Sequence, residues 1–287
     1  MSPERQGVGA CAVDEARLVL RTARFGFPNG FELEPHSHPW GQLVYASTGV
    51  MTVCTTEGTW VVPSRRAVWV PESKQHSIET RGRVRLRAVY LRADLAAALP
   101  RRCAVLGVSP LLRELVNEAV ARHLLRDDRP EELRLAQVLA DQIQTTPSAP
   151  LGLPWPTDPR AARVAQAIAR DLGSTPPTAE LARGSGASPR TLERLFARET
   201  GLTLGRWRSQ ARLLEALRLL AAGESVTEVA TAVGFAGPSA FVSMFRRALG
   251  TTPGRYFAGD PRAPNGRLSP RPAPEWTPPA GSRRPRR

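Results

Sequence analysis

The C-terminal part of the chain carries one pattern twice, and this repeat restricts the possible folds more than any other feature. Residues 196–207 read Phe-Ala-Arg-Glu-Thr-Gly-Leu-Thr-Leu-Gly-Arg-Trp, and 49 residues later residues 245–256 read Phe-Arg-Arg-Ala-Leu-Gly-Thr-Thr-Pro-Gly-Arg-Tyr. A short apolar segment and a glycine precede each copy, Gly186 in the first and Gly234 in the second. Helix, tight turn and helix in this order are typical of a helix-turn-helix unit, whose second helix enters the DNA major groove. The repeat therefore predicts two such units in tandem, over about residues 178–199 and 226–249.

The first unit has the stronger chemistry for reading a base sequence. Thr178 is predicted to cap its first helix, and Ser188 to cap its second, which opens at Pro189. Apolar residues at 192, 195 and 196 face the core, so three charged side chains project outward: Arg190, Glu193 and Arg194. Arginine can donate two hydrogen bonds to guanine, and glutamate can accept one from cytosine. We therefore expect these three side chains to contact base edges.

The second unit has the better helix cap, but its predicted recognition helix exposes smaller and less charged side chains. The segment Ser-Val-Thr-Glu at 225–228 is a capping box, and the last recognition helix is predicted to start at Pro238. Its outward residues include Ser239, Ser243 and Arg246, only one of which is charged. We expect this helix to bind DNA through phosphates and groove shape more than through base edges.

The distribution of charge favours a nucleic-acid partner. The net charge is +14. Residues 151–287 hold 21 Arg against 10 acidic residues, a balance of +11, whereas residues 1–150 hold 19 Lys and Arg against 16 acidic residues, a balance of +3. A basic half beside a nearly neutral half fits a DNA-binding domain joined to a domain of another kind. Double-stranded DNA, as a promoter or operator, is the expected partner.

Composition argues against a membrane protein and against export. The chain has no run of about 18 apolar residues, and residues 1–20 carry acidic side chains and no continuous apolar stretch. The three cysteines, Cys11, Cys54 and Cys103, lie far apart in no metal or redox spacing. We expect a cytoplasmic protein with reduced thiols and no membrane partner.

The first 92 residues are rich in short strand-like runs. Glycine, proline and serine separate these runs at intervals of roughly 8–12 residues, which is typical of a β-sandwich or barrel. Within this region the pattern Gly-x5-His-Ser-His-x3-Gln-x6-Gly runs from residue 30 to residue 49. Side chains two apart on a strand share a face, so His36 and His38 are predicted to converge, and His76 could join them from a neighbouring strand.

This spacing resembles the first cupin motif, with Gln42 where that family usually has glutamate. The second cupin motif is only partly kept, because Ser73 stands where glycine is usual. The resemblance implies a cupin-like barrel that binds a divalent metal through His36, His38, Gln42 and His76. A neutral amide is a poor metal ligand, so a metal-free pocket for an organic effector or water is an equal alternative. Four aromatic residues could line such a pocket or belong to the core: Trp40, Tyr45, Trp60 and Trp69.

The middle of the chain changes to a helical pattern. Apolar residues recur at helical spacing from 112 to 123 and from 135 to 143. We expect residues 93–145 to pack on the barrel and to pair with a second copy of the chain. Residues 146–159 are rich in proline and are predicted to be a stiff linker. Residues 258–287 are rich in proline and arginine and are predicted to be a disordered tail.

Residues 160–257 resemble the DNA-binding domain of AraC/XylS-family transcriptional regulators, on the segment from Gly234-Phe235 to Pro253-Gly-Arg-Tyr-Phe257. The resemblance implies seven helices, two helix-turn-helix units in adjacent major grooves, and control by an effector bound in the barrel. The expected fold class is α+β multidomain, with a cupin-like barrel and helices over residues 1–145 and an all-α domain over residues 160–257.

Three functions compete at this stage. The first is a DNA-binding transcriptional regulator, a homodimer that takes a small-molecule effector and contacts RNA polymerase if it is an activator. The second is a metal-dependent cupin enzyme, a dioxygenase or isomerase, fused to a DNA-binding domain. The third is a constitutive DNA-binding protein whose barrel only dimerises. We expect the first, without catalytic activity, because the acidic cupin ligand is missing and a DNA reader is attached.

Overall fold

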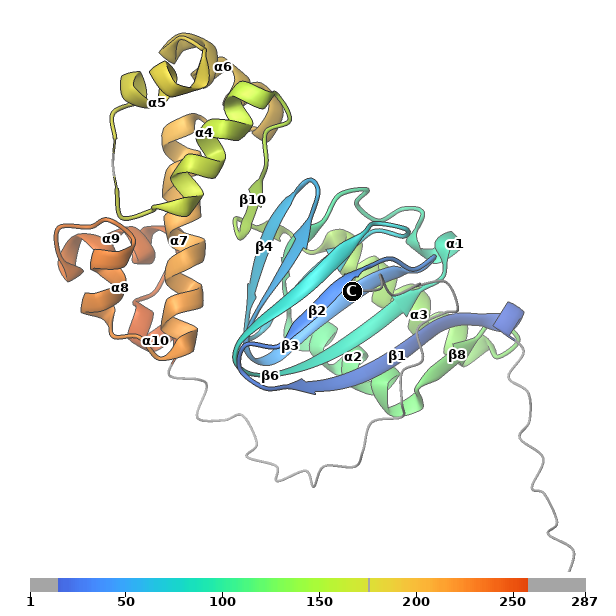
Figure 1. Ribbon diagram of the computed structural model, residues 1–287. Coiled ribbons are helices and arrows are strands. Elements are labelled where there is room, and N and C mark those ends of the chain that lie inside the picture. Colours follow the sequence, from blue (N-terminus) through green and yellow to red (C-terminus); the bar gives the residue numbers. More distant parts are fainter. Residues whose placement is uncertain (1–14, 175, 258–287) are drawn as a thin grey trace, which may run out of the picture.

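A curved antiparallel sheet and a separate helical unit make up the protein (Figure 1). The computed structural model describes residues 15–174 and 176–257. The predicted tail over residues 258–287 lies outside the described residues, as does Cys11. The two parts confirm the predicted α+β class, with a cupin-like sheet domain followed by helix-turn-helix units.

Ten strands form one sheet in the described residues. A single 3-10 turn, η1 (Glu15–Arg17), precedes them. The strands are β1 (Leu18–Phe27), β2 (Glu32–His36), β3 (Gly41–Thr55), β4 (Gly58–Pro63), β5 (Arg66–Val70), β6 (His76–Leu91), β7 (Ala104–Gly107), β8 (Leu124–Arg126), β9 (Ser148–Ala149) and β10 (Gly152–Pro154). Their main order is β8-β1-β6-β3-β5-β7-β9, with β2 added on β6 and with β4 and β10 added on β3.

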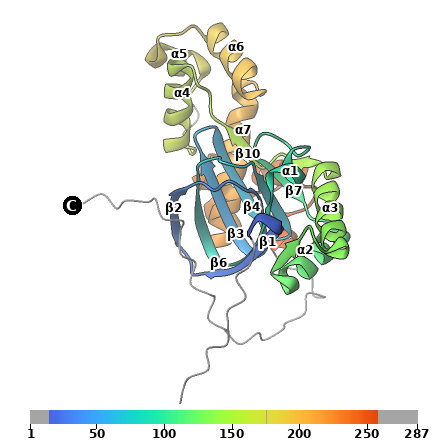
Figure 2. The same ribbon diagram turned by 90° about the vertical axis from the view of Figure 1, so that its right-hand side faces the viewer.

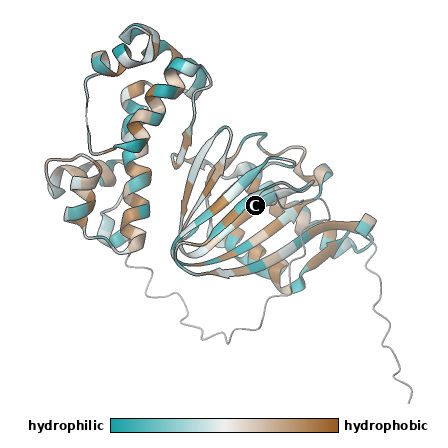
Figure 3. Ribbon diagram, viewed as in Figure 1, coloured by the Kyte–Doolittle hydropathy of each residue, from teal (hydrophilic) through white to brown (hydrophobic). Residues whose placement is uncertain are grey.

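The two longest strands bend the sheet back on itself. β3 pairs with β6 along most of its length and also with β5 in its first half and with β4 in its second half. β6 likewise pairs with β2 near its start and with β1 near its end. Buried and more exposed residues alternate along most of β6, as strand geometry requires when the two faces meet different surroundings, whereas the first six residues of β3 are all buried. Hydrophobic and hydrophilic residues are accordingly interspersed over the sheet (Figure 3). The sheet therefore has an inner face, which looks into the curve, and an outer face.

Helices cover the outer face (Figure 2). They are α1 (Ala93–Ala96), α2 (Pro110–Arg122) and α3 (Pro130–Thr145). Leu43 and Val89 of the sheet are fully buried in one core cluster with Leu112 and Leu139 of these helices. The helical spacing thus predicted α2 and α3 correctly. The same region also contributes β7 and β8 to the sheet, which the helical prediction for residues 93–145 missed, because strands of three or four residues are too short to show a period.

The predicted linker is not a free spacer. Within residues 146–159, β9 pairs with β7 and β10 pairs with β4, so this segment forms part of the sheet. Proline excludes a helix but is tolerated on an edge strand, where its missing N–H is not needed. Trp207 of the helical unit then donates its indole N–H to the Pro154 carbonyl, at 2.7 Å. The segment joins the two parts of the molecule by direct contacts.

The described part of the C-terminal unit contains seven helices, the number that the family resemblance implied. They are α4 (Pro159–Arg170), α5 (Thr178–Ser185), α6 (Pro189–Thr200), α7 (Leu204–Ala222), α8 (Val226–Ala232), α9 (Pro238–Leu249) and α10 (Pro253–Phe257). The predicted caps at Ser188 and Ser225 are present, and Ser225 forms the full capping box. Thr178 does not cap α5 as predicted, because it is already the first helical residue and Pro177 holds the cap position.

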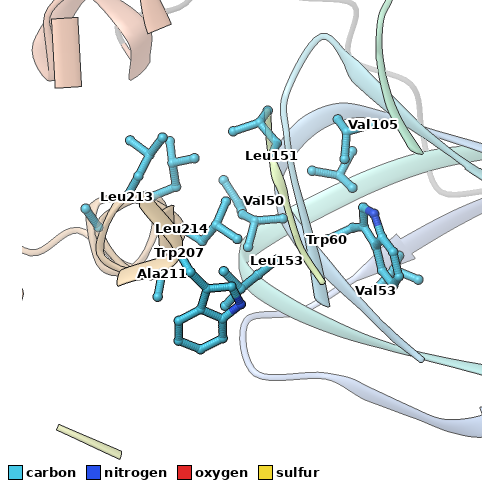
Figure 4. Close-up of a cluster of buried hydrophobic side chains, with 14 of the residues drawn as sticks. Val50, Val53, Trp60, Val105, Leu151, Leu153, Trp207, Ala211, Leu213 and Leu214 are labelled. Atoms are coloured by element: carbon cyan, nitrogen blue, oxygen red, sulfur yellow. The ribbon is translucent and has the colours of Figure 1, made fainter. Parts of the chain in front are cut away.

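One hydrophobic core runs from the inner face of the sheet into the helical unit. Figure 4 shows Trp207 and Leu214 of α7 beside Leu153 of β10 and Val50 of β3. At the rim of this contact Arg218 of α7 forms an ion pair with Glu79 of β6, at 3.0 Å. The sheet domain therefore packs directly on the helix that connects the two helix-turn-helix units.

Candidate DNA interface and histidine site

The second helix of the first unit, α6, presents an arginine-bearing face. Leu192, Leu195 and Phe196 are buried, which turns Arg190 and Arg194 outward, where both are exposed. Neither guanidinium forms a hydrogen bond or ion pair within the described part of the chain. Both side chains can therefore reach a DNA groove without first breaking a contact.

Glu193 is placed differently from its prediction. It is half-buried, and its carboxylate accepts a hydrogen bond from the Leu204 backbone N–H at 3.2 Å. Leu204 is the first residue of α7, where the leading N–H groups have no partner within the helix. Glu193 thus holds the junction between α6 and α7, a contact across the turn that helical spacing alone does not reveal.

The second helix of the second unit, α9, presents a smaller and less charged face. Phe241 and Phe245 are fully buried and stack edge to face, which fixes the rotation of the helix. Ser239, Ser243 and Arg246 are exposed on the opposite side, as predicted from the spacing. Two short hydroxyls and one guanidinium can bond phosphates or single base edges.

The connecting helix α7 sets the distance between the two reading helices. Its 19 residues correspond to about 28 Å at the usual rise. Figure 1 shows α5 and α6 at one end of α7 and α8 and α9 at its other end. Successive major grooves on one side of DNA are about 34 Å apart. The length of α7 is therefore comparable to the spacing of neighbouring grooves.

Three histidines meet at one edge of the sheet domain. One ring nitrogen from each of His36, His38 and His76 lies within 4.8 Å of the other two. His36 ends β2 and faces His76, the first residue of β6, in the strand register, with ring centroids 4.3 Å apart. His38 lies beyond the end of β2, so the predicted convergence is real but arises from β2–β6 pairing and a loop, not from one strand face.

Backbone carbonyls orient all three rings. The Nδ1 atoms of His36, His38 and His76 lie 3.0, 2.7 and 2.8 Å from the carbonyls of Glu34, Trp40 and Lys74, respectively. A carbonyl can only accept, so each Nδ1 carries the proton, and the Nε2 atoms of His36 and His76 keep their lone pairs. Nε2 of the neutral His38 ring is then also an acceptor, so its contact with the side-chain amide of Gln42, at 3.2 Å, is a hydrogen bond only with the NH2 group of that amide turned toward the ring.

Burial favours the neutral form of the two inner rings. Desolvation lowers the pKa of His38, and it lowers the pKa of His76 to about 4. The Nε2 atom of His76 is buried without a hydrogen-bond partner. A buried nitrogen that keeps a lone pair and lacks a donor is the kind of atom that a metal ion or a ligand donor would satisfy.

The donor set fits a divalent transition metal. Three neutral imidazoles oriented through Nδ1 are a common arrangement around zinc and related ions, whose nitrogen ligands lie about 3.3 Å from one another. His36, His38 and His76 would hold the ion after a small contraction of the present cluster. The amide oxygen of Gln42, which is buried, lies 3.2 Å from His38 Nε2 and is the fourth candidate. A bound ion would supply a positive centre for an anionic or polar ligand.

The structure separates the four aromatic candidates. Trp40 lies at the site, over Arg21, whose Cζ is 4.9 Å from its ring centroid. Tyr45 and Trp69 belong instead to the core beneath α2 and α3, and Trp60 packs in the core beside β10.

Two further residues belong to the site, Arg21 and Tyr90, which the sequence motifs did not predict. The alternation of β1 could have revealed the first, because Arg21 shares its strand face with Ala23, Phe25 and Phe27, all apolar. Tyr90 reaches the site only through the pairing of β6 with β1 and β3.

Comparison with known proteins identifies the family. An AraC-like ligand binding domain matches residues 21–127, and a helix-turn-helix domain matches residues 181–259. The HTH-type transcriptional regulator NimR of Escherichia coli (strain K12) is 34% identical over 223 residues, which cover 78% of this chain and 81% of NimR. The chain belongs to the AraC family of transcriptional regulators. This AraC-family protein is accordingly a DNA-binding regulator whose cupin-like domain responds to an effector.

Two more distant similarities were also found. The HTH-type transcriptional regulator RipA of Corynebacterium glutamicum is 29% identical over 221 residues, covering 76% of this chain and 62% of RipA. A structure of ToxT from Vibrio cholerae with an unsaturated fatty acid bound covers 83% of this chain and 95% of ToxT, at 10% identity and a TM-score of 0.35. That score is too low to bear on this regulator's ligand. No helix in the described residues is long and apolar enough to cross a membrane.

Proposed function

We propose that this AraC-family regulator reads base sequence mainly through α6 and anchors itself on DNA through α9. The observation that carries the proposal is the pair of exposed faces at the two ends of α7. The face on α6 has two unpaired arginines in the first half of its helix, whereas the face on α9 has two serines there and its arginines, Arg246 and Arg247, only in the last turn. Arg190 and Arg194 would donate to base edges, and Ser239, Ser243 and Arg246 would contact phosphates and sugars.

Base-by-base substitution of the operator tests this division. The operator is first mapped by footprinting on the DNA upstream of the regulator's own gene. Single-base changes under α6 should weaken binding by roughly 1–3 kcal/mol each, whereas changes under α9 should have little effect. Equal sensitivity at both half-sites would contradict the proposed division.

We also propose that the histidine site is where the effector, a metal ion or an organic molecule, acts. Support comes from a direct connection between this site and the helix that joins the two helix-turn-helix units. His76 is the first residue of β6, and Glu79, three residues further along this strand, forms an ion pair with Arg218 of α7. β6 also runs close to α7 at Gly82, where an added Cβ would lie 2.9 Å from the Ala221 carbonyl. A ligand that pulls β2 and β6 together would bias the contact with α7, and so the population able to bind DNA.

Metal analysis and DNA binding together test the sensing role. Purified regulator is analysed for bound metal, stripped with a chelator, and titrated onto operator DNA with and without Zn²⁺, Ni²⁺ or Co²⁺. A metal-dependent change in operator affinity that disappears in His76→Ala supports the metal form of the proposal. Unchanged affinity in both proteins would remove metal from it and leave the organic effector.

A sensing role, without turnover, is the function that we propose for this site. Three imidazoles with room for a further ligand also occur in catalytic zinc sites, which favours a cupin enzyme as the second candidate. The charged neighbours that shift the pKa values of His38 and His76 are other histidines and Arg21, and no carboxylate is among them. General acid–base chemistry most often needs such a group or a histidine that titrates near neutral pH. Metal-dependent consumption of a bound ligand would establish the enzyme instead.

Further parts of the proposal concern assembly and location. We propose a homodimer formed through α2 and α3, because Leu111, Leu124 and Val138 are exposed large apolar residues on or beside these helices.

We place the protein in the cytoplasm, with RNA polymerase as a partner if it activates transcription. We propose four functional regions: the sensor sheet over residues 1–92, the helical packing and dimerisation segment over 93–145, the connecting segment over 146–159 and the DNA-binding domain over 160–257. The connecting segment also contributes strands β9 and β10 to the sheet.

A further inference from the structure

The inner face of β1 brings an arginine into the histidine site. Leu20 is buried in the core with α2 and α3, and Thr22 donates its hydroxyl to the His123 carbonyl that follows α2, so the even-numbered side chains face the helices. Arg21 therefore faces the other way, toward the inside of the curved sheet. The next residues on that face, Ala23 and Phe25, pack against the inner core.

Aromatic rings hold the guanidinium beside the imidazoles. Arg21 Cζ lies 4.9 Å from the Trp40 ring centroid and 5.2 Å from that of Tyr90, its partner in the β1–β6 register. The Tyr90 ring in turn meets the His38 ring edge to face, with centroids 5.1 Å apart. Burial is the main cause of the lowered pKa of His38, and the positive charge of Arg21 adds to it.

No anion among the described residues pairs with this arginine. Among residues 15–174 and 176–257, Arg21 forms no ion pair and no hydrogen bond with a protein group. An inward-facing guanidinium that is half-buried and lies over two rings keeps its five donors available to a planar acceptor. Its positive charge acts on His38, and no described carboxylate pairs with it, so the local field favours a negative ligand.

The wall beyond Arg21 is apolar. Phe25 and Phe27 lie stacked on the same strand face with centroids 5.6 Å apart, and Phe27 stacks on Phe31 at 4.2 Å. Leu33 of β2 packs against the same core. A ligand with an apolar part would bind more tightly beside these rings, because that part is removed from water. A sugar or a nucleotide would instead leave polar groups without hydrogen-bond partners there.

We propose that the ligand of this site is a small organic carboxylate, whose carboxylate group pairs with Arg21 and whose apolar part lies along the inner face of β1 beyond Arg21, toward Ala23 and Phe25. The imidazoles, with or without a metal ion, bind the second oxygen or a neighbouring polar group of the acid. The proposal deepens the sensing role proposed for the histidine site and rests on it only for the effect on DNA, because ligand binding itself can be measured without DNA.

Calorimetric titration of the full chain tests the ligand class. The probes are acetate, hexanoate and phenylacetate, each beside its primary amide, which has the same shape without the charge. Metal-free and Zn²⁺-supplemented wild type should bind at least one acid saturably and bind the matching amide at least about tenfold more weakly, since hydrogen bonds to charged groups are the stronger class. Inorganic phosphate is titrated as the competing anion.

Two variants assign the binding to one residue. Arg21→Gln should lose about tenfold or more in affinity for the acid, while Arg24→Gln, an exposed arginine three residues along the same strand, should bind like wild type. Circular dichroism and thermal melting check that both variants fold. Arg21→Lys keeps the charge and should retain the preference for acid over amide with weaker binding, because lysine lacks the planar fork.

Several results would overturn the proposal: no saturable binding of any acid to the wild type, binding of phosphate alone, or equal affinity in Arg21→Gln and wild type. The sensing role fails separately. If an acid binds through Arg21 but does not alter operator affinity, the carboxylate site stands and the sensing role falls. If Zn²⁺ alters operator affinity but no acid binds, the sensing role stands and the carboxylate site falls.

Discussion

Arg194 offers the most direct test of how this regulator reads DNA. Its side chain is exposed on α6 and forms no contact within the described part of the chain, so Arg194→Ala should change the free energy of unfolding by no more than about 0.5 kcal/mol. A guanidinium that bonds one guanine through two hydrogen bonds contributes about 1–3 kcal/mol of discrimination at that base pair, or roughly 5- to 150-fold in affinity. The loss should therefore appear in specificity and not in stability.

Fluorescence anisotropy at one fixed salt concentration provides the measurement. Wild type and Arg194→Ala are titrated onto the operator, onto each single-base variant of it, and onto a random duplex. At one base pair the wild type should distinguish the four bases, and Arg194→Ala should bind all four with similar affinity. Arg198→Ala is the matched control, since Arg198 is exposed on the last turn of the same helix and hydrogen-bonded to Glu199.

Removing Arg198 takes away the same charge, and its effect should be equal on operator and random DNA. The reasoning is refuted if Arg194→Ala weakens operator and random duplex by the same factor, because Arg194 would then be a phosphate contact. Glu193→Ala gives a further contrast, because it removes the acceptor of the Leu204 backbone N–H. This variant should lower the free energy of unfolding and change the base preference less than Arg194→Ala does.

Four other results are expected. Ser225→Ala removes the capping box of α8 and should lower the free energy of unfolding by about 1 kcal/mol in urea titrations, while Ser225→Gly should lower it less. Trp207→Phe leaves the Pro154 carbonyl without its donor and should destabilise the protein by about 1–3 kcal/mol, and an unchanged melting temperature would contradict this role of the indole N–H. His76→Ala should abolish Zn²⁺ binding measured by calorimetry, whereas His123→Ala should not. Burial raises the pKa of the Cys103 thiol from 9.0 to about 12, so above about pH 9 the unfolded chain loses this proton while the folded chain keeps it. The free energy of unfolding should therefore fall by about 1.4 kcal/mol per pH unit between pH 9 and pH 12. Cys103→Ala should reduce that slope in urea titrations at several pH values.

The packing of α7 explains how one small site could influence two reading helices. Both helix-turn-helix units contact this helix, and β6 contacts it from the side of the sheet. The hydrogen bond from Trp207 and the ion pair from Arg218 lie near opposite ends of α7. A shift of the sheet edge would thus change the support of the whole connecting helix, and with it the relative placement of α6 and α9.

The sequence by itself determined the parts of this protein that depend on local chemistry. Ser188, Ser225 and Pro238 mark helix starts because capping and proline geometry act within one turn. The exposed positions of Arg190 and Arg194 on α6, and of Ser239, Ser243 and Arg246 on α9, followed from the helical period. These features need no knowledge of distant segments.

Only the tertiary structure decided which distant residues join them. His76 meets His36 through β2–β6 pairing, and Arg21 meets Tyr90 through β1–β6 pairing across 69 positions of the chain. Strand register is set by burial on both faces of the folded sheet, and no local period encodes it. The proline-rich segment became an edge of the sheet for the same reason, since the unpaired edge of β4 was available to it. The exposed faces of α6 and α9 therefore follow from local sequence, whereas the residues of the proposed ligand site come together only through strand pairing.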